Sequence, residues 1–421
     1  MKKRRIIIVS FILCLFFAIS SSALYENGEG IYSDNVYMEN LETGRVVIDV
    51  NSDEKVFPAS LTKILTCILA IEKCEDLSES FEIPRGIFDD IYAQGGAHIS
   101  LKYGEVVTVS DLLHATLIRS ACDTATALAY YVSGDVEAFA NDMNTKAHEI
   151  GATSTHFVNA HGLHDDSHYT TAKDMALIAK YALQNQTFCD IISKWNYTMP
   201  ATNMSEERYF ETTMDVENPE SDAYYPYITG IKSGFTDEAG RCLITKAQKD
   251  GETFLLVTLG ANRDRYYLSN MAFTDAVNLY EYCFARFSFK NIIEKDIILS
   301  SVNVEEGLAD TVSLTASRTQ SYLCAVDEDV SVTYNIPERV KAPVMVGDEI
   351  GSVTVTVDEY TVTEPLFATA DVKAVPKSSF ISDNSFINVL NISTVVIYAI
   401  SIIVLVLFCT TFYSKKKKRI K

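Results

Sequence analysis

The 421-residue sequence lacks the paired cysteine and histidine spacings that form zinc sites, and it contains no C-x-x-C. Of its nine cysteines, Cys14 and Cys409 lie in apolar terminal segments. The other seven are Cys67, Cys74, Cys122, Cys189, Cys242, Cys283 and Cys324. Seven is an odd number, so at least one of these thiols is unpaired, and the spacings indicate no disulfide framework. We therefore predict no metal site.

Basic residues are also scarce, since 36 Lys and Arg stand against 56 Asp and Glu, for a formal net charge of -20. Four of the basic residues lie at positions 2–5 and six at positions 415–421. Subtracting those ten from 36 leaves 26 basic residues against 56 acidic ones, a charge of about -30 for the main body. Such a charge repels phosphate backbones and argues against a nucleic-acid partner.

Both ends of the chain carry apolar segments. Residues 1–23 combine a basic start, an apolar run and small residues, which predicts a secretory signal peptide, with an uncleaved anchor as the alternative. Residues 389–412 predict a transmembrane helix, preceded by a polar linker at 377–388 and followed by a basic tail at 413–421. Because basic flanks remain cytoplasmic, we predict a single-pass protein of the cell membrane whose main body is extracytoplasmic.

The main body divides into two predicted domains. Residues 24–290 predict an α+β domain, because helical patterns in the middle are bracketed by strand patterns on both sides. The helices are expected at Ser60–Ile71, Leu112–Tyr131 and Thr171–Leu183, and the strands within Asn35–Val50, Ile228–Thr245 and Thr253–Gly260. Apolar residues cover every face of the first helix, which indicates an interior position. Residues 291–376 consist of short alternating runs and predict a small all-β domain.

The pattern S-x-x-K, which can pair a serine nucleophile with a lysine base, occurs three times. Lys55, the partner of Ser52, follows Asp53 and Glu54, whose charges favour its protonated form. The pair at 414 and 417 lies in the solvated basic tail. The context therefore favours the remaining pair.

Ser60 and Lys63 fall in the first turn of the predicted interior helix, where side chains three residues apart meet. Loss of hydration among apolar neighbours lowers the pKa of a lysine and frees its lone pair for proton abstraction. The helix N-terminus also favours negative charge on the serine oxygen. A capping serine with a lysine that reaches solvent is the structural alternative.

Two further segments carry polar groups suited to acyl transfer. Ser120-Ala121-Cys122-Asp123 lies between two helical stretches, and Lys232-Ser233-Gly234 lies on a predicted strand. A lysine and a hydroxyl on one strand can bind a substrate carboxylate, and the glycine permits close approach of the substrate backbone.

The order and spacing of these three segments resemble the penicillin-interacting serine acyltransferases, and more closely the low-molecular-weight D-alanyl-D-alanine carboxypeptidases of peptidase family S11. The resemblance rests on Pro58–Lys63, Ser120–Ala129, Asn159–Leu163, Tyr169–Met175 and Gly230–Thr236. It implies a β-lactamase/transpeptidase-like catalytic domain followed by a small all-β domain and membrane attachment. It also implies removal of the terminal D-alanine from peptidoglycan pentapeptides without a cofactor, and covalent inhibition by β-lactam antibiotics.

The resemblance further implies roles for individual residues. Ser60 would be the nucleophile, Lys63 its base, and Ser120 a proton carrier to the leaving D-alanine. The substrate carboxylate would bind Lys232 and Ser233, with Arg265 as a further candidate. Gly234 would allow close approach of the substrate, and the backbone N–H groups of Ser60 and Phe235 would bind the oxyanion.

Cys122 departs from the family, which usually has asparagine at this position, and a thiol forms weaker hydrogen bonds to substrate and lysine. Two alternatives therefore remain open. A serine β-lactamase shares the three segments, but no Glu-x-x-Leu-Asn element follows Ser120. A catalytically weak penicillin-binding or wall-binding protein is the other, with Cys122 as the cause.

Overall fold

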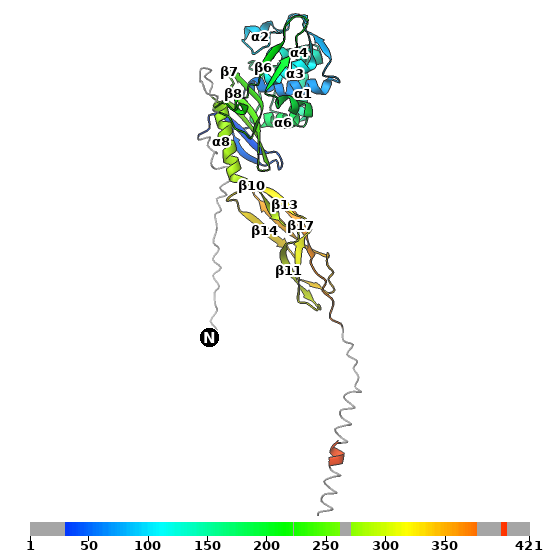
Figure 1. Ribbon diagram of the computed structural model, residues 1–421. Helices are drawn as coiled ribbons and strands as arrows, with labels where there is room; N and C mark the ends of the chain where they lie inside the picture. The colour runs from blue at the N-terminus through cyan, green and yellow to red at the C-terminus, as the bar shows by residue number, and fades with distance from the viewer. Residues whose placement is uncertain (1–29, 222, 262–270, 377–396, 402–421) are drawn as a thin grey trace, which may run out of the picture. The chain divides into compact units, whose positions relative to one another are not determined.

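The computed structural model describes residues 30–221, 223–261, 271–376 and 397–401 (Figure 1). Several predictions concern residues outside these ranges, namely the signal peptide, Arg265, the linker, the basic tail and most of the predicted membrane span. Within the described part of the chain, no helix has the length and apolar character required to cross a bilayer.

A five-stranded antiparallel sheet with the order β2-β1-β9-β8-β7 forms the centre of the first compact unit. Its strands are β1 (Asn35–Asn40), β2 (Val46–Val50), β7 (Ile228–Thr236), β8 (Gly240–Lys249) and β9 (Glu252–Ala261). β1, the first of these strands in the sequence, pairs with β9, the last, so that Met38 lies opposite Leu256. The antiparallel sheet predicted from both ends of the domain is confirmed.

Helices cover both faces of this sheet. On one face the sheet shares a hydrophobic core with a group of helices, of which α6 contacts β1 and β9: α1 (Lys63–Lys73), α3 (Val109–Ile118), α4 (Cys122–Ser133), α5 (Val136–Glu149), α6 (Ala172–Leu183) and α7 (Gln186–Ile192). The opposite face packs against α8 (Met271–Arg286), as Figure 1 shows. Alternation along β9 produces the two cores, because Leu255 and Val257 face the first helices whereas Phe254 and Leu256 face α8.

Smaller elements surround the helical layer. They are the 3-10 helices η1 (Ala59–Thr62) and η2 (Asp215–Glu217), helix α2 (Asp89–Ala93), and the strand pairs β3 (Ser80–Glu82) with β4 (Val106–Thr108) and β5 (Asn196–Met199) with β6 (Arg208–Glu211).

The predicted helices are confirmed with one refinement. Lys63–Ala70 are buried without interruption, as the apolar pattern indicated, and the Thr171 side chain caps α6 by accepting from the N–H of Asp174. The predicted helix Leu112–Tyr131 is broken between α3 and α4, where Ser120 has a φ of +63°. The break turns a run of helix-forming residues into the corner that presents Ser120.

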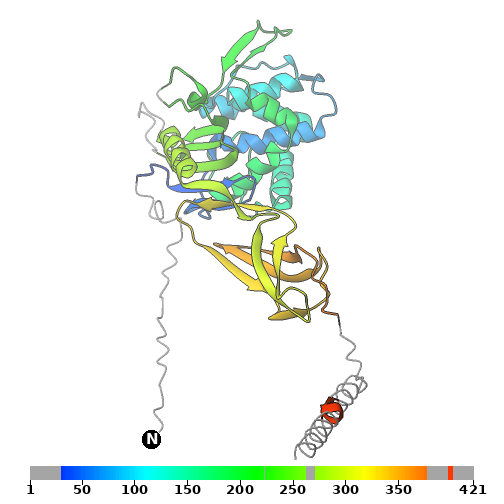
Figure 2. The same ribbon diagram turned by 60° about the horizontal axis from the view of Figure 1, so that its bottom comes forward.

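Residues 287–376 form strands and no helix, so the small all-β region predicted for 291–376 is confirmed. Strands β10 (Phe287–Ile293) and β13 (Gln320–Ala325) pair within the first compact unit, which extends to Glu294 and also contains Thr319–Ser331 and Val355–Val362. A six-stranded sheet, yellow to orange in Figure 2, has the order β14-β16-β17-β12-β11-β15. Its strands are β11 (Ile298–Glu305), β12 (Thr311–Ala316), β14 (Val330–Asn335), β15 (Arg339–Lys341), β16 (Glu349–Val357) and β17 (Tyr360–Ala368).

Candidate active site

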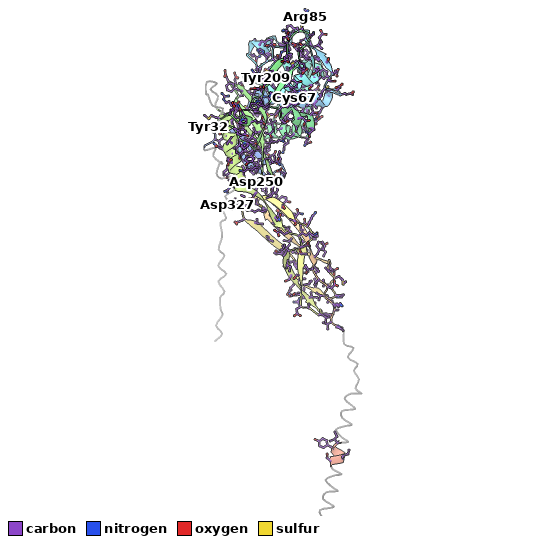
Figure 3. The ribbon with its side chains drawn as sticks, viewed as in Figure 1. Tyr32, Cys67, Arg85, Tyr209, Asp250 and Asp327 are labelled. Carbon is purple, nitrogen blue, oxygen red and sulfur yellow. The ribbon has the colours of Figure 1, made fainter. Side chains whose placement is uncertain are left out.

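Ser60 and Lys63 lie at the junction between η1 and α1. The Nζ atom of Lys63 lies 2.8 Å from Oγ of Ser60, and the lysine side chain is fully buried. Side chains three residues apart share a helix face, so one turn is enough to form this pair. Cys67, one turn further along α1 and labelled in Figure 3, lies in the same buried layer.

Lys63 has two further polar neighbours. Its Nζ lies 2.6 Å from the carbonyl oxygen of His161 and 3.4 Å from Sγ of Cys122. In the neutral form that proton transfer requires, Nζ would have two N–H groups for His161 and Cys122 and one lone pair for Ser60. This geometry suits Lys63 to accept the serine proton. The His161 carbonyl was missed by the sequence analysis because a backbone acceptor has no sequence signature.

The loop that carries this carbonyl is fixed by Asn159, whose Oδ1 accepts hydrogen bonds from the N–H groups of His161 and Gly162. Gly162 has a φ of +80°, and a Cβ atom there would lie 1.8 Å from the carbonyl oxygen of Ala59. Only glycine allows this approach. Burial lowers the pKa of the His161 imidazole to about 3, so the ring is neutral at physiological pH.

Ser120 and Cys122 lie at the break between α3 and α4. The N–H of Cys122 donates to the carbonyl oxygen of Ala97 at 2.6 Å. The buried carboxylate of Asp123 accepts hydrogen bonds from two further N–H groups of the loop 97–101. Burial raises the pKa of Asp123, and these hydrogen bonds oppose the shift. The residues after Ser120 therefore hold a second loop beside it.

Strand β7 supplies the third predicted segment. A Cβ atom on Gly234 would lie 2.7 Å from the backbone nitrogen of Ser60, so glycine lets the strand contact the nucleophile's turn. Lys232 is fully buried, and its Nζ donates to the carbonyl oxygen of Ser233 at 2.8 Å. Burial, and secondarily the charge of Lys63, lower the pKa of Lys232 to about 7.

These segments enclose one cavity of about 400 Å³. The predicted residues that line it are Ser60, Ser120, Cys122, Ser233, Gly234 and Phe235. Lys63 and Lys232 do not line the cavity, because both are fully buried behind the residues that do. Arg265 lies outside the described residues.

Several lining residues were not predicted from the sequence. They include Gly96, Leu163, Thr213, Asp215, Arg241 and Phe273. Thr213 is the most informative, because its Oγ1 lies 2.8 Å from Oγ of Ser233 and extends the row of hydroxyl groups along the cavity. No local pattern marks Thr213, since it reaches the site from the chain after β6 through tertiary folding.

The described residues contain no cluster of three or more His, Cys, Asp or Glu side chains that could hold a metal ion. The seven cysteines of the described part are free thiols.

A model of the D-alanyl-D-alanine carboxypeptidase family, peptidase S11, matches residues 25–263. The chain belongs to this family. A second model, the C-terminal domain of penicillin-binding protein 5, matches residues 287–374. The family predicted from the motifs is therefore confirmed, together with its all-β domain.

Individual relatives agree with this assignment. The chain is 29% identical to the D-alanyl-D-alanine carboxypeptidase DacF of Bacillus subtilis over 350 residues, which cover 81% of this chain and 85% of the relative. The crystal structure of the Streptomyces K15 DD-transpeptidase matches with a TM-score of 0.54 and 26% identity over 61% of this chain and 98% of that one. The structure of PBP3 from Streptococcus pneumoniae has a TM-score of 0.60 at 22% identity, over 82% of this chain and all of that one, which shows the shared fold.

Proposed function

We propose that this member of the family removes the terminal D-alanine from peptidoglycan pentapeptide stems through an acyl-enzyme on Ser60. The observation that carries the proposal is the 2.8 Å contact between the Ser60 hydroxyl and the buried amine of Lys63. A serine hydroxyl that lies beside a buried amine is an activated nucleophile of the kind used in acyl transfer.

In the proposed reaction, Oγ of Ser60 attacks the carbonyl carbon of the penultimate D-alanine while its proton passes to Nζ of Lys63. The C–N bond then breaks, and the departing amine takes a proton through the hydroxyl of Ser120. Water then attacks the resulting ester and gives a proton to Lys63, which passes it to the departing Oγ of Ser60, and the oxygen of the water remains in the new carboxylate of the shortened peptide.

The backbone N–H groups of Ser60 and Phe235 are proposed to bind the oxyanion that forms in both steps. The contact between Gly234 and the backbone of Ser60 supports this role, because it brings β7 beside the nucleophile. The substrate carboxylate is proposed to bind Ser233 together with Thr213, with the charge of Lys232 beneath them. Arg265 stays a candidate for the same carboxylate.

Export and membrane attachment remain part of the proposal. They rest on the sequence of residues 1–23 and 389–412, with the catalytic domain on the extracytoplasmic side of the cell membrane. Carbonate washing and protease treatment of intact spheroplasts test this proposal. Release of the protein by carbonate, or complete protection from protease, would contradict it.

The activity is tested with the full-length protein, diacetyl-Lys-D-Ala-D-Ala and a labelled penicillin. The proposal expects D-alanine release and a long-lived covalent label. Rapid penicillin hydrolysis would favour a β-lactamase instead. Absence of both reactions would favour a wall-binding protein.

A further inference from the structure

The residue before the proposed nucleophile has a constrained backbone. Ala59 has a φ of +46°, in the left-handed region that residues with a Cβ atom adopt only when their surroundings hold them there. The direction of the Ser60 side chain depends on this turn, because Ala59 is the residue through which the chain enters η1. Whatever holds Ala59 therefore also orients Ser60.

A buried hydrogen-bond chain holds the carbonyl group of Ala59. The hydroxyl of Thr62 donates to this carbonyl at 2.8 Å, and Nε2 of His168 lies 2.8 Å from the same hydroxyl. On the other side of the ring, Nδ1 of His168 accepts a hydrogen bond from the N–H of Val158 at 3.1 Å. Thr62 is fully buried and His168 nearly so, which excludes solvent from the chain.

The direction of every hydrogen bond in this chain is determined. Because Nδ1 accepts from a backbone N–H, the ring proton of neutral His168 must be on Nε2, where it donates to Thr62. The hydroxyl of Thr62 is then left to donate to Ala59. Burial lowers the pKa of His168 to about 3 although the charge of Asp165 opposes the shift, so this tautomer persists at neutral pH.

The same loop also contacts the nucleophile's turn directly. Gly162 approaches the Ala59 carbonyl so closely that a Cβ atom would lie 1.8 Å from it, and 2.8 Å from Oγ1 of Thr62. The carbonyl oxygen of His161 lies 2.6 Å from Nζ of Lys63. The loop from Val158 to His168 thus contacts Lys63 and the turn that carries Ser60.

We propose that His168 is a positioning residue for the acylation step. Through the hydroxyl of Thr62 it holds the Ala59 carbonyl, and so keeps the Ser60 hydroxyl directed at Lys63. The inference rests on the proposed function, because it takes Ser60 as the nucleophile.

Two matched pairs of variants test the inference in the full-length protein. Thr62→Val removes the hydroxyl and keeps the side-chain shape, whereas Thr62→Ser keeps the hydroxyl. His168→Leu removes both polar atoms, whereas His168→Gln keeps one donor and one acceptor. The measurements are the rate constant for acylation by a labelled penicillin, the dissociation constant of the complex that precedes it, and the melting temperature.

Thr62→Val and His168→Leu are expected to lower the acylation rate constant by roughly 10- to 100-fold without weakening the preceding complex. Thr62→Ser and His168→Gln are expected to remain within about threefold of the parent protein. The double variant Thr62→Val/His168→Leu should be no slower than the slower single variant, because both changes break one chain.

Parent-like acylation in a folded Thr62→Val or His168→Leu protein would overturn the inference. Equal losses in the conservative and disruptive member of each pair, or losses that multiply in the double variant, would also overturn it. If Thr62→Val does not fold, His168→Leu and His168→Gln decide alone. A parent protein that penicillin does not acylate at Ser60 would overturn the proposed function and this inference with it, whereas normal parent acylation with unaffected variants overturns the inference alone.

Discussion

The two compact units of the chain differ in the polar groups that they bury. The first unit buries many polar side chains, and some of them belong to the segments that form the cavity: Thr62, Lys63, Ser120, Asp123, His168 and Lys232. In the described part of the second unit, Glu364 is the single buried polar residue, and Arg318 binds it with Nε and a terminal nitrogen. Burial of polar groups costs free energy, so two buried lysines beside a cavity lined with hydroxyl groups indicate a functional site.

The two buried lysines also differ from Glu364, and from Glu39 and Glu105 of the first unit, in how their charge is balanced. Glu364 has a cationic partner that compensates its charge. Lys63 and Lys232 instead have hydroxyl, thiol and carbonyl neighbours, and the charge of Lys63 contributes to the lowered pKa of Lys232. Compensation suits a structural role, whereas the uncompensated Lys232 is left to bind a substrate carboxylate.

The largest expected effect distinguishes the two S-x-x-K pairs of the catalytic unit. Lys63→Ala should lower the acylation rate constant by about 1000-fold or more, because Ser60 loses its proton acceptor. Lys55→Ala is the matched control, since Lys55 is exposed and its Nζ lies over the Tyr169 ring. Stopped-flow acylation measures both. Similar rates in the two variants would contradict the assignment of Lys63.

The second effect concerns Lys232 and pH. Because the pKa of Lys232 is lowered to about 7, its proton is lost as pH rises above 7, and binding of the substrate carboxylate should weaken by up to about tenfold per pH unit. Lys232→Arg stays charged and should give a KM for D-alanine release that is constant between pH 7 and 9. A parent KM that is equally constant would contradict this role.

The same shift has a consequence for stability. Between pH 7 and the ordinary value of 10.5, the unfolded chain binds a proton at Lys232 that the folded chain has released. The contribution of Lys232 to the free energy of unfolding therefore rises with pH across this window. Denaturant titrations of the parent and Lys232→Met proteins at several pH values measure this contribution, which disappears in the variant.

A smaller effect is expected at Cys122. Its Sγ lies 3.4 Å from Nζ of Lys63 and lines the cavity. Cys122→Asn supplies a stronger acceptor and should raise the rate of D-alanine release a few-fold. Cys122→Ala, which removes the polar atom, is the control and should not raise the rate. An unchanged or lower rate in the asparagine variant would show that the Cys122 thiol does not limit the rate of D-alanine release.

The smallest effect on catalysis is expected in the second unit. Glu364→Gln removes the charge that Arg318 binds and should lower the melting temperature by about 3 °C. Acylation by penicillin should be unchanged, because this pair belongs to the unit without the cavity. A parallel fall in the acylation rate would remove the distinction between the two units.

The sequence alone predicted those parts of the site that are encoded locally. Ser60 and Lys63 lie within one helical turn, and the Lys232–Gly234 segment lies on one strand, so their spacing was informative. The apolar pattern of α1 also predicted a buried helix correctly.

The remaining parts depend on contacts between distant segments. Thr213 and the carbonyl of His161 come close to Ser233 and Lys63 only in the folded protein, and no sequence pattern predicts these contacts. The segment at Ser120 was placed between two helical stretches, but its positive φ could not be predicted because its neighbours favour a helix. The hydrogen bonds that connect His168, Thr62 and the Ala59 carbonyl likewise form only in the folded protein.

The most direct test of the central claim is to identify the residue that penicillin acylates. The full-length protein is incubated with the antibiotic, digested, and analysed by tandem mass spectrometry. We predict one adduct, on Ser60, and its loss in Ser60→Ala with the melting temperature preserved. An adduct on Ser52, Ser120 or Cys122, or a label that persists in Ser60→Ala, would contradict the account.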